Sequence, residues 1–207
     1  MEENKSLFSV YKTEEERIQT ILHNVLVMLG NRIYLVREEG VQVKIPLLDP
    51  KTAKVEDKGD NVYLIHVASK EIYVLKILFQ KITAIGKQSI ISDFFKDYPN
   101  QKKIVVAIDF KVKIQDYTFR NNTQLFREIS FLQDILTHAY QSEYELLSSD
   151  EMKKVKEEYN FDEYTGKKLT RGDAIAMYYN LKVGDVIRII RNSPTSGKGL
   201  DYKIVTK

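Results

Sequence analysis

Three residues come closest to the pattern of a metal-dependent nuclease. Such a site needs an acidic residue before one strand and an Asp/Glu-x-Lys motif on the next, so that carboxylates hold a hard cation beside a lysine. Asp60 precedes an apolar run, but Glu71 is followed by Lys76 five positions later, where the motif has its lysine two positions later. Side chains five positions apart on a strand point to opposite faces of a sheet. The spacing therefore argues against nuclease activity.

A second candidate is the run Gly197-Lys198-Gly199, which is similar to part of a phosphate-binding loop. That loop needs a glycine five residues before the first glycine and a Ser or Thr after the lysine. Asn192 and Gly199 stand at those two places, so we interpret the run as a hairpin loop.

The remaining polar candidates are isolated. His23, His66 and His138 share no i, i+4 spacing, which a helical zinc site would need. Asp109 ends an apolar run, and without a second polar group we interpret it as structural. We therefore predict no catalytic residue, no metal and no cofactor.

The length and composition of the chain limit the class of protein to which these residues belong. The chain has 207 residues, of which 43% are hydrophobic and 29% charged, enough for one large domain or two small ones. It has no cysteine, which excludes a disulfide framework and a thiolate metal site. The N-terminus lacks the order of a secretory signal, and no apolar run approaches the ~20 residues of a membrane helix. We expect a soluble intracellular protein.

Charge is unevenly distributed along the chain. The net charge is only +3, yet residues 165–207 hold nine basic and three acidic side chains (Lys167, Lys168, Arg171, Lys182, Arg188, Arg191, Lys198, Lys203 and Lys207 against Asp173, Asp185 and Asp201). This segment fits either an ordinary solvated face or a face toward nucleic acid or an acidic protein surface.

The first 137 residues predict a layered α/β domain. Thr13 and Glu16 form a capping box, helical apolar spacing follows as far as Leu29, and Gly30 is expected to end the helix. Residues 36–60 are expected to be loop with at most a short strand. The further expected elements are a hairpin over 62–67 and 71–77, a helix over 85–98, a buried strand over 103–110 and a helix over 123–137.

The composition changes near His138, where we place the domain boundary. Residues 138–147 predict a connector or strand, Ser148 and Glu151 form a second capping box for a helix ending near Tyr159, and 161–171 show no periodicity. We expect a second, small α+β domain over 138–207.

Four residues of this second domain predict turns and caps. Asp173 is the expected N-cap of a short helix, Asn180 its left-handed stop, and Gly184 and Gly197 bends with positive φ. The helix is followed by two predicted strands, 186–191 and 200–205, around a turn-rich loop.

In order and spacing this region closely resembles the C-terminal domain of the fifth subunit, the common jaw subunit, of the eukaryotic nuclear RNA polymerases and of its small archaeal counterpart. The matching stretches are Asp173, 181–185 (LKVGD), 186–191 (VIRIIR), 193–197 (SPTSG) and 202–205 (YKIV). The likeness extends upstream through Tyr159 and the Ser148 helix start to His138, so it covers about 70 residues.

The sequence departs from the family pattern at four positions. Ala174 replaces a proline, Asn180 a glycine, and Ser142 and Tyr144 stand where many relatives have proline and histidine. The first 135 or so residues match the family only in the order of elements, which would suit a viral or otherwise unusual polymerase.

The resemblance implies a function. It implies a non-catalytic subunit of a DNA-directed RNA polymerase that docks on the largest subunit and contributes to the jaw around downstream DNA. The location would be the nucleus of a cell, or a cytoplasmic viral factory or virion. A free-standing nucleic-acid-binding protein is the alternative.

Two sets of residues follow from this hypothesis. The predicted partner interface comprises Arg188, Arg191, Ser193, Thr195, Tyr202 and Lys203, on an exposed strand edge. Lys102, Lys103, Lys111 and Lys113 flank the buried strand and are expected to lie near DNA phosphates.

Overall fold

The computed structural model describes residues 12–38, 41–86, 89–132, 136, 141–160, 164–193 and 197–206. The chain divides into two compact units. The first unit consists of Met1–Val25, Val55–Ile65 and Ile72–Gln133, and the second of Leu26–Lys54, His66–Glu71 and Asp134–Lys207. Segments from the N-terminal half are thus part of the second unit, so the units are not two consecutive stretches. The domain boundary between residues 137 and 138 stays a prediction.

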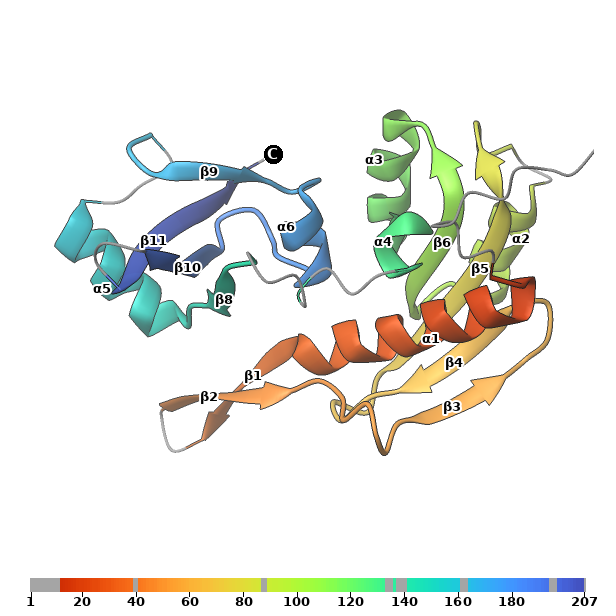
Figure 1. Cartoon of the computed structure of the whole chain (residues 1–207), viewed down its shortest axis with the longest axis horizontal. Helices are drawn as coiled ribbons and strands as arrows, with labels where there is room; N and C mark the ends of the chain where they lie inside the picture. Colours follow the sequence, from red (N-terminus) through yellow and green to blue (C-terminus); the bar gives the residue numbers. More distant parts are fainter. Residues whose placement is uncertain are drawn as a thin grey trace, which may run out of the picture. The chain divides into compact units, whose positions relative to one another are not determined.

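A five-stranded sheet in the order β3-β4-β5-β6-β7 forms the first unit (Figure 1). β6 lies between β5 and β7 and is parallel to both. The strands are β3 (Lys54–Asp57), β4 (Val62–His66), β5 (Ile72–Ile82), β6 (Lys102–Phe110) and β7 (Thr123–Arg127). The predicted hairpin strands and the buried strand correspond to β4, β5 and β6.

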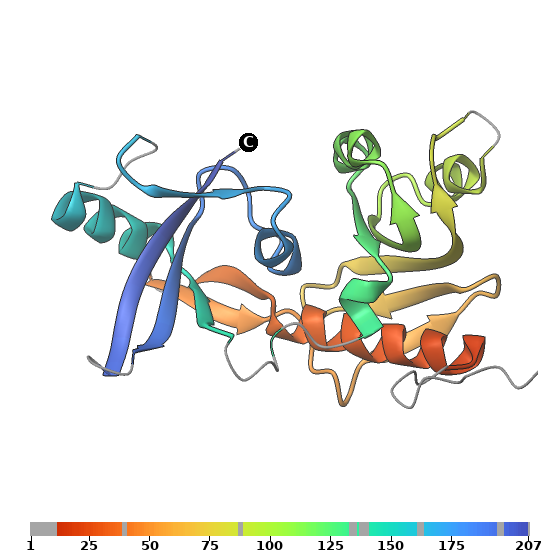
Figure 2. The same ribbon diagram turned by 45° about the horizontal axis from the view of Figure 1, so that its top comes forward.

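Helices cover both faces of this sheet, with α1 (Glu14–Asn31) on one face and α2 (Ile90–Asp97) and α3 (Val112–Arg120) on the other (Figure 2). Ile91 and Phe94 of α2 and Ile114 of α3 pack in one core cluster with Val74, Val105 and Leu125 of the sheet. α2 begins at its N-cap Ser89, so the helix predicted over 85–98 is shorter than expected.

The helix predicted over 123–137 was wrong. Residues 123–127 are β7, and among the described residues of this range the α-helix is limited to Ile129–Leu132 (α4). Leu125 and Phe126 are both buried, as they would be on a helix face, because β7 packs on both of its sides. A parallel pair also needs a crossover, and this is the unpredicted helix α3 between β6 and β7.

α1 has the predicted start but not the predicted stop. The Glu16 N–H donates to Thr13 Oγ1 (3.2 Å), and the Thr13 N–H donates to Glu16 Oε2 (2.7 Å), which completes the capping box. Gly30 lies inside the helix. A Cβ at this position would come within 2.6 Å of Pro50 Cγ, so the glycine allows a close approach where a turn had been expected.

Residues 36–60, interpreted as loop, contain the end of one strand and the whole of two more. β1 (Ile33–Glu38) and β2 (Val41–Pro46) form an antiparallel hairpin, and β3 follows. The prolines that suggested a loop lie at the end of β2 and just beyond it. Proline at such a place removes no interior ladder hydrogen bond.

A four-stranded sheet in the order β8-β10-β11-β9 forms the centre of the second unit. α5 and α6 lie on its two sides (Figure 2): Val155 of α5 packs on Val186 and Ile204, and Ile175 of α6 packs on Ile187 and Val205. The elements are β8 (Glu143–Leu146), α5 (Ser149–Tyr159), β9 (Lys167–Thr170), α6 (Ala174–Tyr178), β10 (Val186–Ser193) and β11 (Gly197–Thr206).

Three features of the second unit bear on its prediction. The Ser148–Glu151 capping box of α5 and the two C-terminal strands are as predicted. β9 was missed within 161–171, because four residues carry no visible period.

Among the described helices, none is long and apolar enough to cross a membrane.

Candidate partner interface

The β10–β11 hairpin carries most of the predicted interface residues. The two strands are antiparallel over their whole length, with Arg188 opposite Tyr202, Ile190 opposite Leu200 and Ser193 opposite Gly197. Thr195 lies outside the described residues, and the side chain of Ser193 is not described.

The structure divides the predicted interface between two faces of the sheet. Successive side chains of a strand point to opposite faces. Arg188 and Tyr202 lie on the face that carries α5, where the Arg188 guanidinium is 5.8 Å from the centre of the Tyr202 ring. Arg191 and Lys203 lie on the face that carries α6. A partner that binds to one face of the sheet therefore cannot contact all of the predicted interface residues.

Ion pairs distinguish the two faces further. On the α5 face, Arg188 Nη1 lies 3.0 Å from Glu145 Oε2 of β8. On the α6 face, Asp201 pairs with both Arg191 (3.5 Å) and Lys167 of β9 (3.0 Å). Strands β8 and β9 thus supply partners that the C-terminal signature did not reveal.

The free strand edges also differ from the expectation. β10 and β11 are the two inner strands, while β8 and β9 are the edges of the sheet. β9 pairs only with Lys203–Thr206, and β8 only with Ile187–Ile190. Within the described residues, an open edge on the hairpin itself is therefore confined to its distal half.

Local geometry at the turn residues explains how the hairpin is held. The Asp173 carboxylate accepts from the Ile175 N–H (2.9 Å) and caps α6. Asn180, Gly184 and Gly197 have φ of 54°, 94° and 73°, the left-handed region that asparagine and glycine tolerate best. The Gly184 N–H donates to Val205 O (2.9 Å), which fixes the turn against β11.

The four lysines predicted to lie near DNA do not form one cluster. Lys103 differs from the expectation of an exposed lysine. It is only 2% exposed, and its Nζ donates to the main-chain oxygens of Tyr98 (2.7 Å) and Gln101 (2.9 Å). Burial lowers the pKa of its ammonium group. Its ammonium binds carbonyls of the segment that joins α2 to β6 and cannot reach a phosphate.

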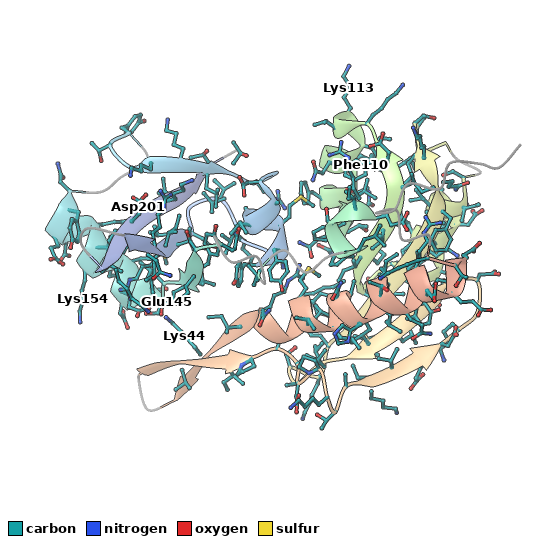
Figure 3. The ribbon with its side chains drawn as sticks, in the orientation of Figure 1. Lys44, Phe110, Lys113, Glu145, Lys154 and Asp201 are labelled. Carbon is teal, nitrogen blue, oxygen red and sulfur yellow. The ribbon has the colours of Figure 1, made fainter. Side chains whose placement is uncertain are left out.

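The other three lysines are exposed but separated. Lys102 begins β6 and lies over the ring of Tyr73 (5.6 Å), whereas Lys111 and Lys113 follow its far end. A strand of this length spans about 27 Å, so these are two sites. Lys113 points away from α3 into solvent (Figure 3).

Two of the polar candidates from the sequence, Lys76 of the nuclease pattern and the isolated Asp109, have structural partners. Lys76 is buried, and its ammonium donates to the main-chain oxygen of Asp60. Asp109 pairs with Arg127 (2.9 Å), and this hydrogen bond lowers the pKa of the carboxyl group. Across the described ranges no group of three or more His, Asp or Glu side chains could hold a metal ion.

Comparison with known proteins agrees with the resemblance. Residues 133–205 match the family model described as RNA polymerase Rpb5, C-terminal domain. The "DNA-directed RNA polymerase subunit 5" of Acanthamoeba polyphaga mimivirus is 46% identical over 207 residues, covering 99% of this chain and 100% of the relative.

Cellular relatives are more distant but also match along most of the chain. The "DNA-directed RNA polymerases I, II, and III subunit RPABC1" of Caenorhabditis briggsae is 23% identical over 204 residues (93% of this chain, 97% of the relative). The corresponding protein of Dictyostelium discoideum is 24% identical over 203 residues (91% and 96%). The full-length match to the viral subunit shows that this chain belongs to the family of the fifth subunit of DNA-directed RNA polymerases.

Proposed function

We propose that the chain is a non-catalytic subunit of a DNA-directed RNA polymerase, which docks on the largest subunit through its second unit. The observation that carries this proposal is the 46% identity to the mimivirus subunit along the whole chain. The match of residues 133–205 to the C-terminal family model supports docking by the second unit, because this part holds the β10–β11 hairpin.

The first unit would lie at the jaw around downstream DNA. Its exposed lysines, Lys102, Lys111 and Lys113, support this role, since phosphate contacts need accessible cations. Lys103 has no part in it, because its ammonium is bound to main-chain oxygens.

A catalytic role within the complex has little support in the chain itself. Lys76 and Asp109, the two candidates that lie on the central strands, are held in structural contacts with Asp60 and Arg127. The chain would therefore contribute binding and position to the polymerase, while other subunits carry out nucleotide addition.

Purification of an affinity-tagged chain under mild salt tests the proposal. A polymerase subunit elutes with two very large polypeptides and brings DNA-directed RNA synthesis with it. A free-standing nucleic-acid-binding protein, the alternative function, elutes without them and would overturn the proposal. Because the relatives come from a virus and from cellular eukaryotes, the identity of the large polypeptides also tells whether a viral or a nuclear polymerase holds the chain.

A further inference from the structure

On the α5 face of the hairpin, five side chains form a continuous surface, the Leu200 patch, made of Tyr159, Arg188, Ile190, Leu200 and Tyr202. Cross-strand pairing joins Arg188 to Tyr202 and Ile190 to Leu200. The Tyr159 ring, at the end of α5, lies 5.6 Å from the Tyr202 ring. The patch is therefore one surface built from α5, β10 and β11.

Apolar groups of this patch remain in contact with solvent. Leu200 is 59% exposed and Tyr159 is 57% exposed, and the Tyr159 ring lies beside Tyr202, which packs against a buried core cluster. The two tyrosines and the arginine match the composition of the centres of protein interfaces, where aromatic residues and arginine are enriched, and Leu200 adds exposed apolar surface beside them.

Two basic side chains beside the patch are already paired within the chain. Arg188 pairs with Glu145 (3.0 Å), and Lys198 lies 3.6 Å from Glu143. A partner that brought an extra charge to this surface would desolvate it without a counterion, which is unfavourable. The patch thus suits a partner surface that is apolar and uncharged.

The α6 face of the same hairpin has a different character. Asp201 binds Arg191 and Lys167, and Lys203 adds a further positive charge beside them. Along β10 and β11, the exposed side chains of this face form ion pairs. Among the described residues of these two strands, the face has no exposed large apolar side chain. Exposed ion pairs contribute little to affinity.

We infer that the Leu200 patch is the docking face, and that it binds an apolar, uncharged surface of the polymerase. This inference rests on the proposed function and goes further, since it selects one face of the hairpin and the chemistry of the partner. Tyr202 and Arg188 are then interface residues, whereas Arg191 and Lys203 lie on the opposite side and do not contact the partner.

Matched substitutions on the two faces test the inference. Leu200→Asp and Arg191→Asp introduce the same side chain on neighbouring strands, at positions that are both exposed. Retention of each full-length variant on affinity-tagged polymerase is compared with the wild type. We expect Leu200→Asp to reduce retention at least about tenfold and Arg191→Asp to change it less than about twofold.

Two further measurements sharpen the test. Tyr159→Ala changes the patch from α5 rather than from the sheet, and is expected to reduce retention while thermal unfolding stays as in the wild type. Wild-type retention is expected to be nearly constant between about 0.1 and 0.5 M salt, because an uncharged contact is not screened.

The outcomes separate the inference from the proposed function. Normal retention of Leu200→Asp, or equal loss with Arg191→Asp, would show that docking does not use this face. Retention that falls steeply with salt would show that the partner surface is charged. A wild-type chain that is not retained at all would refute polymerase association itself.

Discussion

Arg32 donates a hydrogen bond from Nε to the main-chain oxygen of Tyr178 at 2.7 Å, across a sequence separation of 146 residues. Its Nη2 donates to Met177 O (3.1 Å), and the residue is 2% exposed. The guanidinium therefore binds the carbonyl groups at the end of α6, where a helix leaves oxygens without intrahelical partners. The second unit thus depends on a residue from the N-terminal part of the chain.

Replacing Arg32 should weaken the second unit. We expect Arg32→Met to lower the free energy of unfolding by about 2–3 kcal/mol, because buried carbonyls lose charge-assisted hydrogen bonds. Urea denaturation followed by circular dichroism measures the loss. Arg191→Met, at an exposed position, is the control and should change stability by less than about 0.5 kcal/mol. A fragment of residues 138–207 that unfolds at the wild-type midpoint would contradict this dependence.

A second arginine stabilises the first unit. Arg17 binds Glu128 through two hydrogen bonds of 2.6 Å, and its guanidinium lies 4.5 Å from the centre of the Phe79 ring. Glu128 is 6% exposed, and the hydrogen bond to it raises the pKa of Arg17. The pair connects α1 with the turn after β7.

Arg17→Met should be more destabilising than the loss of the whole pair. It leaves the Glu128 carboxylate buried without a cation, which costs about 3–5 kcal/mol. Arg17→Met combined with Glu128→Leu removes both charges and should recover part of that stability. A double-mutant cycle on the free energy of unfolding measures the coupling. Additive effects of the two substitutions would show that the interaction between Arg17 and Glu128 contributes nothing to the free energy of unfolding.

The sequence was sufficient to predict the caps and turns that depend on residues close together in the chain. The two capping boxes, at Thr13 and at Ser148, involve residues three apart, and both form as predicted. The left-handed backbone at Asn180 and Gly184 likewise follows from residue type and from the neighbouring turn.

Long-range contacts account for what the sequence could not show. The apolar period of residues 123–127 fits a helix and a doubly buried strand equally, and only pairing with β6 decides between them. Arg32 was not identifiable as buried, because the carbonyl that it binds belongs to a helix 146 residues away in the sequence. The division of the interface between two faces also required the register of β10 and β11.

Acid should weaken the start of α5 through Glu151. Partial burial tends to raise the pKa of its carboxyl group, but the hydrogen bond from Ser148 N–H (2.7 Å) and the ammonium of Lys44 (2.9 Å) outweigh it and lower the pKa from 4.5 to about 2. The folded protein then binds this proton less readily than the unfolded chain. The stabilisation is complete above pH 4.5 and is lost as the pH falls toward 2.

Glu151→Gln isolates this effect. The difference in unfolding free energy between wild type and variant should shrink as the pH falls from 4.5 to about 2, because the wild type loses its charge in that window. Asp150→Asn, in the same first turn, controls for a general loss of negative charge near the helix start. A difference that stays constant over this range would show that the Glu151 charge contributes no stability.

Catalysis by the isolated chain is not expected. With magnesium present, the purified protein should neither cut nor extend DNA, since Lys76 of the nuclease pattern and the separate candidate Asp109 are held in structural contacts with Asp60 O and Arg127. Gel assays on labelled duplex and single strands measure both activities. Metal-dependent cleavage that disappears in Glu71→Gln or Asp109→Asn would show that the chain is an enzyme.

Contact of the first unit with downstream DNA should depend on Lys111 and Lys113 and not on Lys103. In the assembled elongation complex, replacing both exposed lysines by alanine should make the slope of log K against log salt less steep by about 0.9 for each phosphate that is no longer neutralised. Lys103→Met should leave the slope unchanged, because its ammonium binds Tyr98 O and Gln101 O, and should lower stability instead. Photocrosslinking from DNA phosphates provides an independent measurement. If only other subunits were labelled and the salt slope of the double variant were unchanged, the first unit would not contact downstream DNA.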